Sequence, residues 1–349
     1  MDHRTLLGVD LPIIQAPMAG VQDSELALAV AAAGGLGSLP CAMLSPQQLQ
    51  AELSRLQAHA QNNSPQRFNI NFFCHQPPKP DPAKEQQWRQ LLQPYFAELN
   101  LDMNTIAAGP QRQPFSHAIA DILEPYQPGI ISFHFGLPAA DLLARVKSWG
   151  STVLASATTV EEALWLQANG ADAIIAQGLE AGGHRGMFLS EDLSKQMGLF
   201  ALLPQIVAAV NLPVIAAGGI ADAQGVKAVL SLGAIAAQIG SAYLLCPEAK
   251  TSTLHRAALS CARAQHTAVT NLLSGRPARG IVNRLVSELG PINTKAPGFP
   301  LAATAISALR LQAESQGLDH FSSLWCGQNA SGCQTISATA LTLWLATNV

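Results

Sequence analysis

A histidine and an arginine lie in a glycine-rich loop near the middle of the chain, within the segment AQGLEAGGHRGMF. The segment begins in a short apolar run that predicts a buried strand, so both side chains come at a strand end. An imidazole at this place can contact an anionic substrate near neutral pH, or it can act as a base. An exposed His–Arg pair without a function would not require the glycines that surround it here. We therefore predict that His184 is catalytic and that it also binds the substrate.

Two further strand ends offer backbone groups instead of reactive side chains. Gly218 and Gly219, in VIAAGGIAD, let main-chain amides approach a ligand closely, and a helix is predicted to begin near Ala223. The start of that helix offers unpaired N–H groups and the positive end of its dipole. The next predicted strand ends in a similar loop, QIGSAYLL, which carries Ser241. Loops after the seventh and eighth strands are the usual phosphate site of a barrel, so we predict a phosphate here.

The motifs of the common nucleophilic and metal-dependent enzymes are absent. The chain contains no GxSxG, HExxH, CxxC or Walker motif, and no GxGxxG follows its first predicted strand. Polar groups around a phosphate site therefore indicate a bound cofactor that carries the chemistry. FMN fits, because it has one phosphate and a planar ring that needs apolar walls such as Met18, Phe72 and Phe73. His134, within IISFHFG, is either a core residue or a pocket-lining one, and we retain it as a candidate substrate-binding residue.

Eight short apolar runs have to position these residues. Near-continuous apolarity is typical of strands that are buried on both faces of a parallel sheet. Strand and helix alternate eight times, which predicts an α/β protein with a (β/α)8 TIM barrel; an open doubly wound sheet is the alternative. The predicted strands are Pro12–Ala16, Gly35–Leu39, Arg67–Phe73, Ile130–Phe135, Thr152–Ala155, Ala173–Gln177, Pro213–Ala217 and Ala236–Gly240.

Helix-like segments lie between these runs. Several begin with a capping residue such as Thr159, and others end just before a glycine, as at Gly170 and Gly233. These signals predict helices over Ser24–Ala33, Pro46–Ala60, Pro138–Trp149, Thr159–Asn169, Leu199–Val210 and Ala223–Leu232.

Two segments do not fit the repeat. Cys74–Gly129 begins with the proline-rich HQPPKPDP, and the part after Leu244 has helical patches at Thr253–His266 and Leu301–Gln316. The first leaves from the C-terminal end of a strand, where barrel enzymes build active sites, so both are predicted to cap the site. We expect an FMN-binding barrel of residues 1–75 and 116–250, a smaller, mainly helical substrate-capping region of residues 76–115 and 251–332, and a C-terminal helix over 333–349 that returns to the barrel.

Composition limits the partners and the compartment. Only 12% of the 349 residues are charged, below the ~25% of a typical soluble domain, so most of the chain is expected to be buried. A net charge of −3 argues against nucleic acid or an anionic membrane surface. Residues 26–43 carry no charge, but their glycines and Pro40 predict a helix, a turn and a strand rather than a membrane span. We expect a cytoplasmic protein without a signal peptide.

The six cysteines show no metal-ligand spacing, so we expect no metal site. Reduced thiols are the favoured interpretation. Cys326 and Cys333 are close enough in sequence that a disulfide between them stays open.

Taken together, these segments resemble the nitronate monooxygenase family, formerly called 2-nitropropane dioxygenases. The resemblance spans roughly residues 11–246 and is carried in chain order by PIIQAPMAG, NINFF, QGLEAGGHRGMF, PVIAAGGIAD and QIGSAYLL. It implies a flavin-binding TIM barrel with a smaller helical substrate domain. The implied reaction is the oxidation of alkyl nitronates, such as propionate 3-nitronate, by O2 through FMN to carbonyl compounds and nitrite.

The resemblance also implies roles for single residues. His184, in AGGHRG, matches the family's catalytic histidine; it stabilises the anionic nitronate or abstracts the α-proton of a nitroalkane, and the sequence does not decide between these roles. The residues expected to bind FMN are Ala16, Pro17, Met18, Asn71, Gln177, Gly182, Gly183, Ala217, Gly218, Gly219, Gln238, Ile239, Gly240 and Ser241.

Two departures from the family pattern stand out. Ser241 replaces a common threonine, which keeps the hydroxyl. The segment Phe299–Arg310, FPLAATAISALR, resembles one that supplies tyrosine and other polar side chains to the substrate pocket of the best-characterised subgroup, and here it supplies none. Flavin binding is therefore better supported than the identity of the substrate.

Two other functions remain open at this point. One is an FMN-dependent NAD(P)H reductase of the enoyl-acyl-carrier-protein or quinone type, which resembles this family and shares much of the barrel. The other is a flavin-binding or storage protein with negligible turnover. The expected partners are a small nitronate and O2, with the chain as a monomer or homodimer.

Overall fold

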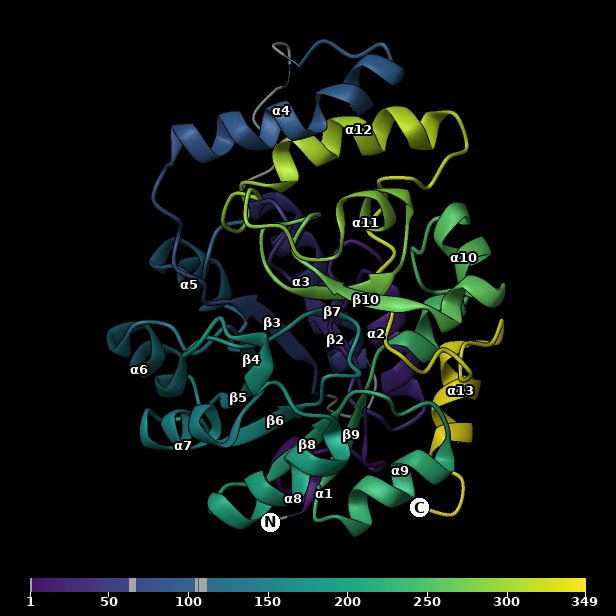
Figure 1. The fold of residues 1–349 in the computed structure, drawn as a ribbon. Coiled ribbons are helices and arrows are strands. Elements are labelled where there is room, and N and C mark those ends of the chain that lie inside the picture. Colours follow the sequence, from purple (N-terminus) through teal and green to yellow (C-terminus); the bar gives the residue numbers. More distant parts are fainter. Residues whose placement is uncertain (1, 63–66, 104–105, 107–111) are drawn as a thin grey trace.

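Eight parallel strands form the centre of the structure, a computed structural model that describes residues 2–62, 67–103, 106 and 112–349 (Figure 1). A parallel bridge between Ile14 and Leu36 joins the two ends of the sheet, so the strands form a barrel. This confirms the predicted barrel and rejects the open doubly wound sheet. In spatial order the strands are β1 (Ile13–Gln15), β9 (Ala236–Ile239), β8 (Val214–Ala217), β6 (Ala173–Gln177), β5 (Thr152–Ala157), β4 (Ile130–His134), β3 (Asn69–Phe73) and β2 (Ser38–Pro40).

All six predicted barrel helices are present, with ends within about two residues of the expected positions. Thr159 caps its helix as the sequence indicates, and Asp23 and Asp222 cap two others; each accepts a hydrogen bond from an N–H of the first helical turn. The helices are α2 (Ser24–Ala32), α3 (Pro46–Asn62), α6 (Ala140–Ser148), α7 (Val160–Ala168), α8 (Leu199–Ala209) and α9 (Ala223–Ser231). α5 (His117–Leu123) precedes β4, and the short α1 (His3–Leu7) precedes β1.

The last helix of the chain lies against the barrel. α13 (Ala338–Leu345) contacts α2 and α9, and it follows β9 in the chain only after almost one hundred residues of other structure. Its Ala338, Leu341 and Leu345 are fully buried in the largest apolar cluster. The hydroxyl of Thr342 lies 2.8 Å from that of Tyr243, which is itself fully buried just after β9. α13 therefore occupies the place of the eighth barrel helix.

The remaining elements gather over the carboxyl ends of the strands. α4 (Pro82–Glu98) and α12 (Ala303–Ser315) lie side by side at the top of Figure 1 and share an apolar cluster that includes Trp88 and Leu309. Below them is an antiparallel sheet, of order β10-β11-β7, that the sequence analysis did not predict. Its strands are β10 (Thr267–Thr270), β11 (Ala278–Ile281) and β7 (Gly183–His184), with α11 (Arg284–Leu289) following β11.

Two local expectations need correction. The predicted helix Thr253–His266 is two pieces, α10 (Thr253–Leu259) and a 3₁₀ turn over Ala262–Gln265, because the chain turns before it enters β10. The predicted loop at Gly183 and His184 is the strand β7.

The cysteines and the apolar stretch behave as expected. All six cysteines are free, which agrees with the reduced thiols. Among the described residues no helix is long and apolar enough to cross a membrane, and residues 26–43 divide into α2, a turn and β2.

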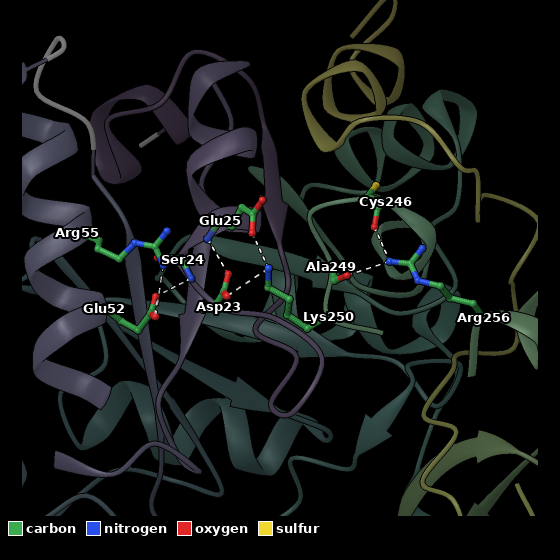
Figure 2. Close-up of polar contacts among 9 residues, drawn as sticks. All are labelled: Asp23, Ser24, Glu25, Glu52, Arg55, Cys246, Ala249, Lys250 and Arg256. Carbon is green, nitrogen blue, oxygen red and sulfur yellow. Dashed lines mark hydrogen bonds and ion pairs between the residues drawn. The ribbon is translucent and has the colours of Figure 1, made fainter. Parts of the chain in front are cut away.

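Ion pairs of Lys250 and hydrogen bonds of Arg256 stabilise the segment that follows β9 (Figure 2). Lys250 makes ion pairs with Asp23 and Glu25 at the start of α2. Arg256, on α10, donates hydrogen bonds of 2.8 Å to the carbonyl oxygens of Cys246 and Ala249. The segment that follows the last strand is thus tied to the loop that follows the first strand, and both loops reach the site described below.

Removing a buried side chain from α13 tests its place in the barrel. Leu341→Ala is expected to lower the free energy of unfolding by ~2–5 kcal/mol, because it leaves a cavity in a fully buried cluster. Leu343, on the same helix, is 54% exposed, and Leu343→Ala is expected to change that energy by less than ~0.5 kcal/mol. Urea denaturation of both variants measures the difference. Equal losses would show that α13 does not pack on the barrel in solution.

Candidate active site

One cavity opens at the carboxyl ends of the barrel strands. The structure brings all of the predicted site residues together around it, although they come from seven different segments of the chain. These residues are Ala16, Pro17, Met18, Asn71, His134, Gln177, Gly182, Gly183, His184, Ala217, Gly218, Gly219, Gln238, Ile239, Gly240 and Ser241.

A glycine cradle lines one side of the cavity, at the ends of β8 and β9. Gly218 and Gly219 have φ values of 118° and 70°, in the left-handed region that favours glycine. A Cβ on Gly218 would come within 3.1 Å of the backbone N of Ala181, so this turn leaves room for main-chain groups only. α9 begins four residues after Gly219, and its first turn is capped by Asp222. The cradle therefore presents backbone N–H groups and a helix start, as a phosphate site requires.

Residues far along the chain complete this cradle. Asn329 donates a side-chain hydrogen bond of 3.0 Å to the carbonyl of Gly219, and Gly327 donates its N–H to the Ser241 hydroxyl at 2.9 Å. A Cβ on Gly182 would lie 2.6 Å from the backbone N of Gly327, so these two segments of the chain can pack this closely only because position 182 is a glycine. Gln238 has a buried Oε1 without a hydrogen-bond partner in the described part of the chain. This acceptor and the glycine cradle fit a ligand that carries both donors and a phosphate.

The loop that carries His184 is held by polar side chains from the strands. Gln177, at the end of β6, donates to the carbonyl of His184 at 3.0 Å and accepts from the N–H of Gly186 at 2.7 Å. His134, at the end of β4, donates its Nε2–H to the same carbonyl at 3.1 Å, and its Nδ1 faces the hydroxyl of Ser156 at 3.0 Å. Of its two interpretations, His134 is therefore the pocket-lining one, and it also holds the loop that carries His184.

Arg185 points away from the cavity. Its side chain is completely buried and donates to the carbonyls of Gly178 and Gln177, at 2.7 and 2.8 Å, and to Gln196 at 3.0 Å. Arg185 therefore supports the loop, although it is adjacent in sequence to His184. A guanidinium buried here is satisfied because several loop carbonyls converge on it.

His184 lies in an aromatic box. Its ring centre is 5.2 Å from that of Phe299, 5.5 Å from Trp325, 6.1 Å from Phe135 and 6.2 Å from Phe73. The Nε2 atom is 2.9 Å from the Oγ of Ser274, which adjoins β11 in the small sheet. The imidazole therefore faces the cavity with apolar walls and one hydroxyl partner.

Burial keeps this imidazole neutral. Desolvation lowers the pKa of His184 well below 6.5, and the positive charges of Arg112, the neighbouring histidines and Arg276 lower it further. The ring is then a hydrogen-bonding group and a potential base rather than a fixed cation.

Several cavity residues were missed by the sequence analysis. Arg112 belongs to the insertion after β3, and Trp325, Gly327 and Asn329 come from the segment between α12 and α13. Their segments carry no strand-end or glycine-loop signal of their own. Only the chain path shows that they return to the barrel mouth.

The state of the imidazole can be measured directly. In ¹⁵N-histidine-labelled, ligand-free protein, the His184 ring is expected to give the signals of a neutral imidazole at pH 6.5, because its pKa lies well below that value. The spectrum of a His184→Gln variant assigns the resonance. A half-protonated ring at pH 6.5 would contradict the burial argument.

Comparison with known proteins gives a consistent result. A family model described as nitronate monooxygenase matches residues 3–346. The chain is 40% identical over 341 residues to a nitronate monooxygenase of Pseudomonas aeruginosa, covering 96% of this chain and 95% of the relative. It is 41% identical over 346 residues to one of Paraburkholderia phytofirmans, covering 96% and 91%.

Solved structures agree with these sequences. The nitroalkane oxidase of Streptomyces ansochromogenes superimposes with a TM-score of 0.88 at 36% identity, over 99% of this chain and 96% of that one. FabK from Thermotoga maritima has a TM-score of 0.73 at 23% identity, over 99% and 94% of the two chains, which shows a shared fold. By its sequence matches along nearly the whole length, and by the barrel that they share, the chain belongs to the nitronate monooxygenase family.

Proposed function

We propose that the protein is an FMN-dependent nitronate monooxygenase that oxidises alkyl nitronates with O2 to carbonyl compounds and nitrite. The observation that carries the proposal is the placement of a neutral, half-buried His184 in an aromatic box that opens onto the same cavity as the glycine cradle. Relatives of 40% identity bear the same name. A small nitronate and O2 are then the partners.

The cradle residues suit the phosphate of FMN. Gly218, Gly219 and Gly240 supply backbone near the ligand, and Ser241 adds a hydroxyl. Gln238 and Asn71 offer amide groups to the polar edge of a flavin ring, and Met18 offers it an apolar wall. The remaining residues of the predicted set fill the space between these groups. When bound, FMN supplies the acceptor for the electrons that leave the nitronate.

His184 acts on the substrate itself. Its neutral ring can donate a hydrogen bond to a nitronate oxygen, and it can accept the α-proton of a neutral nitroalkane. The surrounding rings of Phe299, Trp325 and Phe73 exclude water, which strengthens either interaction. In the proposed division of the chain, segments 76–115 and 251–332 form the cap, residues 1–75 and 116–250 form the barrel, and 333–349 returns to it. The cap supplies Phe299 and Trp325 to this box, and the barrel supplies Phe73 and Phe135.

Flavin reduction separates this function from its alternatives. Purified protein is expected to be yellow and to release FMN on heating. Under anaerobic conditions, propionate 3-nitronate is expected to change the flavin absorbance, because the nitronate is the electron donor, and NADH is expected to have little effect. Rapid bleaching by NADH alone would instead identify a reductase, and colourless protein that FMN does not reconstitute would end the flavin proposal.

Replacing the imidazole tests its role. His184→Asn is expected to keep its flavin and to lose ~10²–10⁴-fold in kcat/KM for the nitronate, the usual contribution of a positioned proton-transfer or hydrogen-bonding group. His266→Asn, which changes an exposed histidine at the edge of the small sheet, serves as the matched control and is expected to retain activity. Full turnover in His184→Asn would remove this residue from the mechanism.

A further inference from the structure

Arg112 is the single charged side chain, histidines aside, among the described residues that line the cavity. It comes from the insertion between β3 and β4, and it is only partly buried. The glycine cradle, in contrast, offers backbone groups and a hydroxyl. The net charge that the cavity walls present to a ligand therefore comes from this one guanidinium.

Arg112 lies on the His184 side of the cavity. Its Cζ is 5.6 Å from the ring centre of Phe299, and the same ring is 5.2 Å from the ring of His184. Of the charges that lower the pKa of His184, that of Arg112 acts most strongly. Arg112 and His184 thus flank the same aromatic ring.

The phosphate cradle is across the barrel from this arginine. In the strand order, β3 is four positions from β8 in the ring of eight, so the two strands face each other across the barrel. His75, which hydrogen-bonds to the backbone of Arg112, lies two residues after the end of β3 at Phe73, whereas Gly218 and Gly219 follow β8. The guanidinium therefore lies at the His184 end of the cavity, opposite the glycine cradle.

No carboxylate within the described part of the chain makes an ion pair with Arg112. Surface arginines such as Arg145, Arg263 and Arg284 each contact an acidic side chain, but the charge that acts on Arg112 is another cation, Arg310. A partly buried cation without a counter-ion is costly, and an anionic ligand would relieve that cost.

The segment Phe299–Arg310 contributes no polar side chain to the cavity wall. No residue of Phe299–Arg310 lines the cavity directly; Phe299 forms only the aromatic wall behind His184 and Arg112. A polar group at the far end of a substrate therefore meets Arg112 and no other charged partner among the described lining residues.

We propose that Arg112 is the residue of this chain that binds the carboxylate of a substrate such as propionate 3-nitronate, a role for which Phe299–Arg310 offers no cavity-lining side chain. The inference rests on the proposed function, since it assigns the nitronate group to His184. The planar guanidinium matches a carboxylate with two parallel hydrogen bonds, which an uncharged chain end does not use. Arg112 thereby sets substrate preference, while His184 acts at the reacting atoms.

A matched pair of substrates isolates this contact. Propionate 3-nitronate has the terminal carboxylate and propyl 1-nitronate lacks it. In Arg112→Gln holoenzyme, KM for propionate 3-nitronate is expected to rise ~10–100-fold with little change in kcat, as for loss of a charge-assisted hydrogen bond. The kcat/KM for propyl 1-nitronate is expected to stay within about twofold. Lys79→Gln, which removes an exposed cation from the same insertion, is the control and is expected to change neither value.

Equilibrium binding tests the same contact without turnover. Succinate carries two carboxylates, one in place of the nitronate and one in place of the tail, and butanoate carries one. Flavin absorbance titrations of the holoenzyme are expected to show tighter binding of succinate, an advantage that Arg112→Gln abolishes and Arg112→Lys keeps in part. A wild-type enzyme that turns over neither nitronate would defeat the proposed function, whereas the succinate advantage would still support the role of Arg112.

Two outcomes would overturn the inference. If Arg112→Gln weakened both nitronates equally, with melting temperature and flavin content unchanged, the arginine would act as a general electrostatic group. If it weakened neither, and if succinate bound no better than butanoate, the guanidinium would not face the substrate.

Discussion

The site depends on one backbone atom, the carbonyl oxygen of His184. This oxygen accepts two hydrogen bonds, from Gln177 at the end of β6 and from His134 at the end of β4. A buried carbonyl without partners would cost free energy, so the two strands and the loop are stable only in this arrangement. Gln177 also receives the N–H of Gly186, which closes the loop on its far side. The imidazole is therefore positioned through its own main chain.

The burial of the charged side chains near His184 differs with their contacts. Those that are fully buried hold the protein together, and the partly buried Arg112 faces the cavity. Glu162, almost fully buried on α7, accepts hydrogen bonds from the N–H groups of Thr158 and Phe188 and thereby holds the chain beyond His184. Arg185 binds loop carbonyls. Arg112 lines the cavity and makes no ion pair with a carboxylate of the described residues. Arg185 therefore stabilises the loop of the site, whereas Arg112 faces the cavity where a ligand would bind.

The sequence predicted those parts of the structure that have local causes. The strands are short apolar runs, the barrel helices begin at caps such as Thr159 and Asp222, and the cradle needs glycine at Gly218 and Gly219 because of their positive φ. The site residues near strand ends were found for the same reason, since parallel strands bring their carboxyl ends together. The role of Arg112 and the contact of Gly327 with Gly182 arise only when distant segments meet, and no local pattern encodes such meetings.

The pairing of β7 with β11 links His184 to a distant part of the chain. His184 is paired with Ala278, and Gly183 with Arg279, so the segment that carries His184 is an edge strand of the small antiparallel sheet. The N–H of Arg185 extends this contact to the carbonyl of Pro277. The position of the imidazole therefore depends both on the barrel strands and on the small antiparallel sheet. A change that displaces β11 is therefore transmitted to His184 through the backbone pairing of these two strands.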